Sequence, residues 1–337
     1  MTEMDQRLTS AEMAQLWNAY MNNNMYMCVL KFFKEKTEDN DLCAIIDFAI
    51  ETCEKLVNEI IGIYEKEDHP IQKSVTVEED VNLQAPLLYS EVLMLSYIHD
   101  MTRYGMIGYS TAVSIAVRSD VLELFTESLH LDIELYKKAL KLLQDKGVYY
   151  RNPSVPIPEK VEIAKKEGYL SGFIGEQRAL TVIEIMNIYN DMQRNALGKA
   201  LLLGFSQTAA SPDVIKFMTK GVRLFNESVE EFTKTLIKEN ISVSSTWDSE
   251  VLNSTTPPFS DKLMMMQVVM YIATISGFYG TALGTSSRRD LGVMYGKLMA
   301  EILSLGNEAA KILITNGWLE QAPQSIDHNH IAKLKKK

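Results

Sequence analysis

Cysteine is scarce in this sequence. The three cysteines, Cys28, Cys43 and Cys53, are odd in number and show no Cys-x-x-Cys spacing. This pattern argues against a disulfide framework and against a structural zinc site, whose ligands recur at short fixed intervals. We therefore expect reduced thiols and a cytoplasmic protein.

Positive charge is also in short supply. The chain carries 34 Lys and Arg against 44 Asp and Glu, a formal net charge of −10 at pH 7. Nucleic-acid binding rests on the neutralisation of phosphates by Lys and Arg, so we expect no nucleic-acid partner. The basic cluster at the end of the sequence, Lys333 with residues 335–337, is typical of a solvated polar tail.

Motifs for acyl or phosphoryl transfer are missing. The sequence contains no nucleophile elbow, P-loop, dinucleotide-binding fingerprint or zinc-ligand spacing. Hydrophobic residues nevertheless make up 46% of the 337 residues and charged residues 23%, which is typical of a globular chain. A chain of this length is expected to form about two domains, each with a core of its own.

One apolar run needs a separate explanation. Residues 263–287 contain no charged side chain and are numerous enough to cross a bilayer. Gln267, Thr274 and Ser276 lower the hydrophobicity of this run, so we expect a central helix buried by its neighbours and no membrane span. Charged residues also precede the first apolar run of the chain, which predicts no signal peptide.

The chain repeats itself. Residues 8–12 (LTSAE) match residues 180–184 (LTVIE), and both are Thr-x-x-Glu capping boxes that mark a helix start. Asn23 recurs as Asn195 at the same offset of 172 residues. Further matches follow at an offset of 170 residues: YSEVLML with FSDKLMM, Tyr109 with Tyr279, VRSDV with SRRDL, and Gly147 with Gly317. Matches in one order with a single slip indicate an internal duplication.

Each copy predicts four helices. The expected helices span residues 9–36, 41–67, 87–116 and 120–146 in the first copy, and 181–209, 213–239, 260–286 and 290–316 in the second. Gly147 and Gly317 follow the last helices as C-cap glycines, and nearby prolines prevent continuation. The predicted units are a first bundle (1–150), a linker (151–179), a second bundle (180–320) and a polar tail (321–337).

Connection lengths predict the topology of each bundle. A few residues join the first helix to the second and the third to the fourth, so each of these pairs is antiparallel. The middle connections, 68–86 and 240–259, are long enough to run the whole length of a helix. A crossover that makes the second and third helices parallel is the ferritin-like arrangement. The predicted fold is therefore all-α, with two tandem ferritin-like four-helix bundles.

Nearly the whole chain resembles an uncharacterised bacterial family of tandem ferritin-like bundles from spore-forming bacteria, related to spore-coat proteins. The strings that carry the resemblance are LTSAEMAQLW, EEDVNLQAPLLYS, RSDV, NALGKALLLGFSQ, TWDSEV, PPFSDKLMM and NGWLEQAP. The resemblance implies the fold and an association with the spore, and it names no reaction.

A ferritin-like frame raises the question of a metal site. Glu127 and His130 have the Glu-x-x-His spacing by which such bundles present ligands to two iron or manganese ions. With Glu51, Glu54 and His99, they are the candidate ligands of the first bundle. A metal-binding oxidoreductase that uses the first bundle only is therefore one predicted function.

The helical wheel argues against this site. Leu122, Phe125 and Leu129 begin the predicted apolar stripe of the fourth helix, and Glu127 and His130 point away from it. The second copy has no Glu-x-x-His at all. We expect the pair on the solvated surface and His99 buried between helices as a core histidine, so no cofactor is predicted.

Polar residues also fall on predicted interior faces. Asn23 and Asn195 occupy matched positions in the first helix of each copy, and Lys199 lies one turn after Asn195. A buried lysine must be paired, and Asp248 and Glu250 in the crossover are the predicted partners. We predict that Asn195 and Lys199 fill, with hydrogen bonds, the level where a relative would hold metal. The alternative is that Lys199 extends to the surface.

The predicted helix 260–286 has a methionine-rich face. Four methionines and three aromatic residues are typical of an adaptable pocket lining and equally of ordinary core: Met264, Met265, Met266, Met270, Tyr271, Phe278 and Tyr279. The predicted function is a non-catalytic structural or interaction protein linked to sporulation, with a homo-oligomer or a spore protein as its partner. A small apolar ligand among the methionines is a further alternative.

Overall fold

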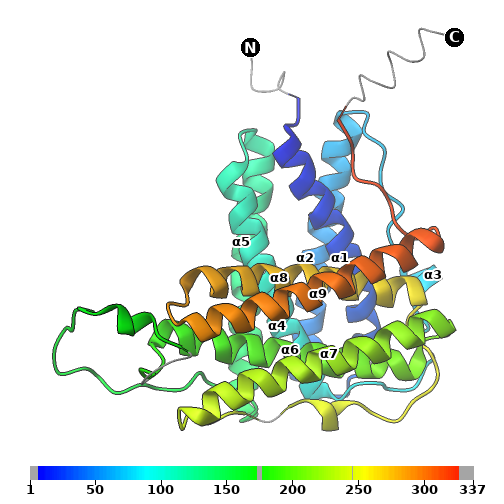
Figure 1. Cartoon of the computed structure of the whole chain (residues 1–337). Coiled ribbons are helices and arrows are strands. Elements are labelled where there is room, and N and C mark those ends of the chain that lie inside the picture. Colours follow the sequence, from blue (N-terminus) through cyan, green and yellow to red (C-terminus); the bar gives the residue numbers. More distant parts are fainter. Residues whose placement is uncertain (1–6, 173–176, 245, 326–337) are drawn as a thin grey trace, which may run out of the picture.

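The computed structural model describes residues 7–172, 177–244 and 246–325, and it confirms an all-α fold of two tandem four-helix bundles (Figure 1). The first bundle consists of α1 (Ser10–Lys36), α2 (Asn40–Lys66), α4 (Glu91–Ile115) and α5 (Ser119–Asp145). The second consists of α6 (Val182–Thr208), α7 (Pro212–Lys238), α8 (Asp261–Thr285) and α9 (Arg289–Thr315). The short turns α3 (Val77–Asp80), η2 (Glu167–Leu170) and η3 (Asp248–Glu250) lie in the connections.

The helices begin and end at the residues that their caps dictate. Thr9 and Thr181 form capping boxes with Glu12 and Glu184, which occupy the predicted third positions of α1 and α6. The last helix of each bundle is followed by a glycine in the left-handed region, at φ 69° and 68°: Gly147 and Gly317. A residue with a side chain is strained there, which explains the glycine.

Buried ionic contacts tie the helix ends together. In the first bundle, Glu12 Oε1 accepts hydrogen bonds from the backbone of Val117 and Arg118 at 2.9 and 2.8 Å, and the Arg118 guanidinium pairs with Glu67 and Asp120. The start of α1 therefore meets the end of α2 and the junction of α4 with α5. Matched residues repeat this network in the second bundle: Glu184, Arg288, Glu239 and Asp290.

The opposite end of the bundle fixes the direction of α4. The Glu91 carboxylate at the start of α4 accepts hydrogen bonds from the backbone of Glu38 and Asp39, between α1 and α2. Because α2 and α4 both run from this end to the other, they are parallel, and the crossover between them runs the length of the bundle.

The two crossovers pair with each other reciprocally. Val81 forms an antiparallel bridge with Phe259, and Tyr89 forms the matching bridge with Val251. Side-chain hydrogen bonds repeat the exchange: Ser90 Oγ to Glu250 Oε2 at 2.6 Å, and Ser260 Oγ to Asp80 Oδ1 at 2.5 Å. Each partner in one contact is 170 residues from its equivalent in the other. An approximate two-fold axis therefore relates the bundles, as in an isologous dimer.

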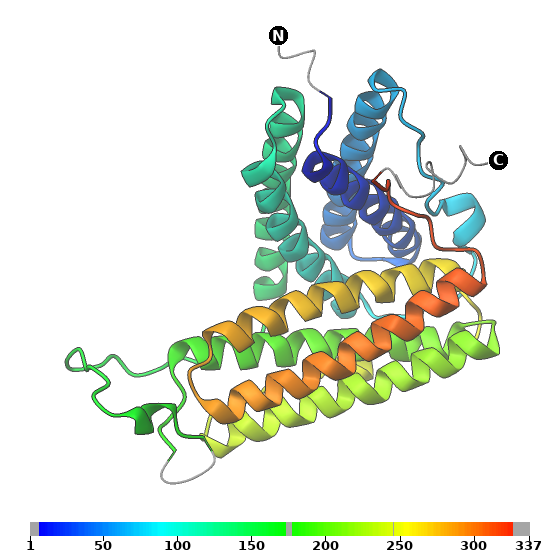
Figure 2. The ribbon, with the colours of Figure 1, turned by 45° about the horizontal axis from the view of Figure 1, so that its top comes forward.

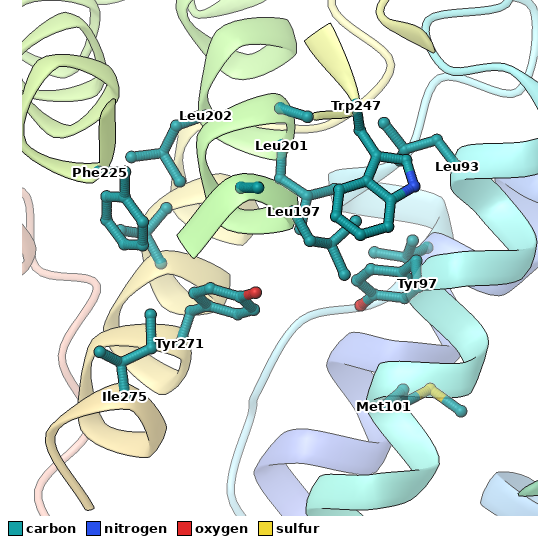
Figure 3. Packing of buried hydrophobic residues seen from close by; sticks show 14 of the residues in the cluster. Leu93, Tyr97, Met101, Leu197, Leu201, Leu202, Phe225, Trp247, Tyr271 and Ile275 are labelled. Atoms are coloured by element: carbon teal, nitrogen blue, oxygen red, sulfur yellow. The ribbon is translucent and has the colours of Figure 1, made fainter. Parts of the chain in front are cut away.

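The bundles share one hydrophobic core where they cross. Figures 1 and 2 show the second bundle lying across the first at a steep angle. Figure 3 shows Trp247 beside Leu93 of α4 and Leu201 of α6, and all three belong to one buried cluster. The indole Nε1 of Trp247 donates to Ser96 Oγ at 3.2 Å. The bundles are thus packed as a single body.

The charge-free run forms α8. Its most apolar stretch has a mean hydropathy of 1.4 and is 50% buried inside the protein. The side chains of Leu263, Met264 and Met265 are fully buried in the second bundle. Core packing therefore accounts for much of this composition, and one such helix is weak evidence for a membrane span.

Candidate functional site

The structure does not bring the five predicted metal ligands together. Glu127 and His130 are exposed on α5, and Glu127 forms an ion pair with Lys55. Within residues 7–172, 177–244 and 246–325, no three side chains of His, Cys, Asp or Glu form a group that could hold a metal ion. The other three candidates are also apart: Glu51 is exposed, Glu54 pairs with Lys31 at 2.9 Å, and His99 is buried.

The buried face of α5 is rotated from the predicted stripe. Leu122 is 38% exposed, whereas Asp132 is only 6% exposed and faces the bundle interior. The Asp132 carboxylate occupies the space that a side chain on Gly105 of α4 would need. Burial raises the pKa of Asp132 well above its usual range. The prediction that Leu122 belongs to the buried stripe of α5 was wrong. For the same reason Asp132 was not identified as an interior residue.

The two matched asparagines make matched contacts. Asn23 Nδ2 donates to Tyr109 OH at 3.0 Å, and Tyr279 OH donates to Asn195 Oδ1 at 2.9 Å. Both asparagines also donate to the backbone carbonyl four residues earlier in their helix. An Asn–Tyr pair thus joins the first and third helices of each bundle, and both tyrosines were matched by the 170-residue offset.

Lys199 belongs to a different contact. Its Nζ lies 2.7 Å from Asp248 Oδ2, one of the two predicted partners, and it donates to Asn226 Oδ1 at 3.0 Å. Glu250, the other predicted partner, accepts from Ser90 instead. Asn195 and Lys199 therefore do not share one network, because they face different neighbours.

Two pockets lie where the bundles meet. The first, which we call the apolar pocket, has a volume of about 660 Å³ and is lined mainly by α1, α4, α8 and the segment after α9, with one residue each from α5 and α9. The second, which we call the polar pocket, has a volume of about 510 Å³ and is lined by α4, α6, Tyr136 of α5, the segment after α5 and Trp247. The contacts of α1 with α8 and of α4 with α6 are equivalent under the two-fold axis, so the pockets are equivalent places.

The apolar pocket takes part of the methionine-rich face. Met266, Met270 and Phe278 line it, together with Tyr26 and Tyr104 from the first bundle. The four other residues predicted for this lining are buried and do not line the pocket: Met264, Met265, Tyr271 and Tyr279.

The polar pocket holds buried charge. His99, Asp100 and Arg194 line it and are 8%, 5% and 6% exposed. The atoms His99 Nε2, Asp100 Oδ2 and Arg194 Nε have no hydrogen-bond partner among the described residues. Arg103 Nη1 lies 3.5 Å from Asp100 Oδ1, beyond good hydrogen-bond geometry. A buried polar group without a partner is costly, so these atoms call for an explanation.

Aromatic rings and a buried acid shape the same pocket. The His99 ring stacks on Tyr136 at 4.9 Å, and burial, aided by the Arg103 charge, lowers the pKa of His99 to about 4. The Arg194 guanidinium lies 3.4 Å from the centre of the Phe278 ring and 3.3 Å from Asp191 Oδ1. Burial raises the pKa of Asp191 to about 6 against the opposing effect of Arg194.

The duplication allows the two linings to be compared position by position. Four residues of the polar pocket have uncharged counterparts in the apolar pocket: His99 and Val269, Asp100 and Met270, Arg103 and Ala273, and Arg194 and Asn22. The fold at these four positions is compatible with uncharged side chains, and charged or titratable residues occupy them in the polar pocket only. The two linings therefore differ in chemistry at equivalent places in the fold.

Comparison with known proteins identifies a family without an assigned activity. Residues 1–161 and 169–331 each match the family described as "Protein of unknown function (DUF3231)". A candidate spore coat protein from Bacillus halodurans C-125 is similar in structure, with 19% identity and a TM-score of 0.38 over 48% of this chain and 100% of that one. This likeness is too distant to support an argument, and no curated protein matches the chain. The two matches cover nearly the whole sequence, so the chain belongs to the DUF3231 family and contains its domain twice.

Proposed function

We propose that the chain is a non-catalytic binding protein that holds a small apolar molecule between its two bundles. The observation that carries the proposal is the apolar pocket, whose volume of about 660 Å³ falls within the range of small-molecule sites. Met266 and Met270 supply flexible, polarisable walls that adapt to a ligand, and Phe278 and Tyr26 supply flat ones.

One polar feature could orient the ligand. Asn23 and Tyr109 line the pocket and already donate and accept within their own pair at 3.0 Å. An apolar molecule with a single hydroxyl or carbonyl group could extend this pair by one hydrogen bond. Such a combination of apolar walls and few polar groups is typical of ligand sites.

The segment after α9 closes one side of the pocket. Trp318 and Leu319 line the pocket, and the next residue, Glu320, accepts hydrogen bonds from the backbone of Lys73 and Ser74 at 3.0 and 2.6 Å. These bonds fasten the segment to the first bundle. The pocket therefore depends on both bundles and is not expected in either one alone.

A plugged pocket tests the proposal. A Cβ atom added at Gly277, which lines the pocket, meets no other atom within 4 Å, so Gly277→Leu begins a side chain in open space at the pocket wall. Gly284 on the same helix is equally open and lies outside the pocket lining, so Gly284→Leu is the control for adding a leucine to α8.

The measurement is binding of the neutral fluorescent probe 1-aminoanthracene, together with a native mass spectrum of the purified chain. We expect the probe to bind the unaltered chain and Gly284→Leu alike, and Gly277→Leu to bind it at least about tenfold more weakly. Equal binding by the two variants, or no binding by any chain, would contradict the proposal.

The family resemblance supports a setting for this binding. We propose that the protein acts in association with the spore, as an interaction protein and without a reaction of its own. A fluorescent fusion followed through sporulation of a spore-forming host tests this part. Signal at the forming spore is the expected result, and uniform signal with no change during sporulation would contradict it.

The metal-binding oxidoreductase predicted as the alternative is not adopted. Its five candidate ligands would have to converge, and Glu127 and Glu54 are engaged with lysines at the surface instead. Metal analysis of protein purified without chelator tests this choice. One or two irons or manganese ions per chain, lost in His99→Gln or His130→Gln, would restore the alternative.

A further inference from the structure

The polar pocket is positively charged within an acidic protein. Asp100 is its single lining acid among the described residues, against Arg103, Arg151 and Arg194. The whole chain, in contrast, has a net charge of −10. Arg194 is buried beside Asp191, Arg103 is half-buried beside Asp100, and Arg151 is exposed at the rim. The three arginines among the lining residues favour an anion, and arginine in particular matches the geometry of a carboxylate.

We propose that the polar pocket binds a small planar carboxylate that also carries a hydrogen-bond donor, such as a hydroxy- or amino-substituted aromatic acid. The site is separate from the apolar pocket, and the inference does not depend on the function proposed above. Arg103 and Arg194 would receive the carboxylate, and the Oδ2 atom of Asp100 would accept from the donor group.

The unpartnered atoms support both halves of this assignment. Arg194 Nε is a buried donor without an acceptor among the described residues. Asp100 Oδ2 is a buried acceptor that is also left without a hydrogen bond of ordinary length, although the buried Tyr104 hydroxyl is a neighbouring donor. A ligand that offers an acceptor at one end and a donor at the other satisfies both atoms at once. An inorganic anion would satisfy only the first.

Ring stacking supports the planar part of the ligand. Tyr136, Tyr149 and Trp247 line the pocket, and two of them already hold the His99 ring at 4.9 and 5.8 Å between ring centres. The volume of about 510 Å³ is ample for one substituted ring. Flat aromatic walls favour a flat ligand over a branched aliphatic acid of the same charge.

The equivalent pocket shows that the charges are not a requirement of the fold. At the positions of Asp100 and Arg103, the second copy has Met270 and Ala273, which line a pocket of the same origin. A purely structural role would allow the same apolar residues on both sides and would avoid the cost of unpartnered buried charge. Recognition of a ligand explains the charges at Asp100 and Arg103, whereas packing alone does not.

Titration calorimetry with 4-hydroxybenzoate tests the proposal, and its neutral analogue 4-hydroxybenzamide is the comparison probe. We expect the carboxylate to bind and the amide to bind at least about tenfold more weakly. Arg103→Gln should weaken the carboxylate by a similar factor. The control is Arg223→Gln, which removes an exposed arginine that lies outside this pocket and should change nothing.

A fluorescence titration tests which of the two pockets binds the carboxylate. Trp247 lines the polar pocket, whereas Trp17 and Trp318 line the apolar one, and the sequence contains no other tryptophan. In a chain with Trp17→Phe and Trp318→Phe, 4-hydroxybenzoate should still change the emission of Trp247. Absence of carboxylate binding at millimolar concentration, equal affinity for the amide, or a response confined to Trp17 and Trp318 would overturn the proposal.

Discussion

The polar and the apolar pocket occupy equivalent places in two copies of one sequence, and they differ in almost every functional side chain. Arg194 faces one pocket where Asn22 faces the other, and Asp100 stands where Met270 stands. The crossovers between the pockets have kept their reciprocal hydrogen bonds. After duplication, the contacts that hold the bundles together were thus retained, while the space between the bundles acquired two chemistries.

The ends of the two bundles, in contrast to the pockets, have kept the same polar contacts. Glu12 and Glu184 make the same contacts to the backbone before α5 and α9. Burial by itself would raise the pKa of Glu184, but hydrogen bonds from Arg178 and from the backbone of Thr181 and Arg288 lower it to about 2. Matched polar residues at the bundle ends therefore have a structural role, whereas the unmatched charges of the polar pocket are candidates for function.

The largest expected effect is the difference in stability between a substitution of Arg194 and one of its counterpart Asn22. Arg194→Met leaves Asp191 buried without its charged partner, and we expect a loss of about 3–5 kcal/mol in the free energy of unfolding. Asn22→Met changes a half-buried residue of the apolar pocket, and we expect a change below about 1 kcal/mol. Urea denaturation monitored by circular dichroism measures both. Similar losses for the two variants would mean that the pockets do not differ in this way.

The next effect is a pH dependence from Asp191. Because its pKa is raised to about 6 in the folded state, the stability tied to its proton is fully present below its unfolded pKa of 3.8 and is lost as pH rises through 6. The loss amounts to about 3 kcal/mol. Asp191→Asn should remove this decline between pH 4 and 6, and an unchanged decline in urea denaturation would contradict the assignment.

His99 gives a smaller effect of opposite sign. Its pKa is lowered to about 4, so the stability that it contributes as a neutral ring is present above its ordinary value of 6.5 and is lost as pH falls through 4. Between pH 7 and 5 the expected loss is about 2 kcal/mol. His99→Val introduces the residue of the apolar pocket and should abolish this loss. The midpoint of thermal unfolding at the two pH values measures it, and an equal shift in both chains would be evidence against a buried neutral ring.

The smallest effect concerns the Glu-x-x-His pair, which lies outside both pockets. Glu127 is exposed and paired with Lys55, so Glu127→Gln should change the free energy of unfolding by less than about 1 kcal/mol. Binding of 4-hydroxybenzoate and of 1-aminoanthracene should be unchanged as well. A change in either affinity would show that this surface communicates with the pockets.

Much of the fold could be predicted because its signals are local or repeated. Capping boxes, C-cap glycines and the two offsets predict the helices and the duplication, and the structure confirms them. The burial of Asp132 could not be predicted from the stripe that Leu122 begins, because α5 packs with its face rotated. The heptad spacing of Asp132 from Phe125, which is buried, was the signal that would have found it.

The pockets could not be predicted from the helical wheel of any single helix. The burial of His99 was predicted, but its place beside Arg194 in a pocket between the bundles was not, because no periodicity within one helix reports how the second bundle crosses the first. The sequence did contain an indirect signal. At the 170-residue offset that matches Tyr109 with Tyr279, Asp100 falls on Met270, a pairing of a buried charge with an apolar residue.

Tryptophan fluorescence tests the central claim, that one duplication produced an anion pocket and an apolar pocket, most directly. Two chains are needed, one retaining only Trp247 and one with Trp247→Phe that retains Trp17 and Trp318. Each is titrated with 4-hydroxybenzoate and with 1-decanol. The account predicts that the carboxylate changes only the emission of Trp247 and that the alcohol changes only that of Trp17 and Trp318. A response of both chains to the same probe, or of neither chain to either probe, would contradict it.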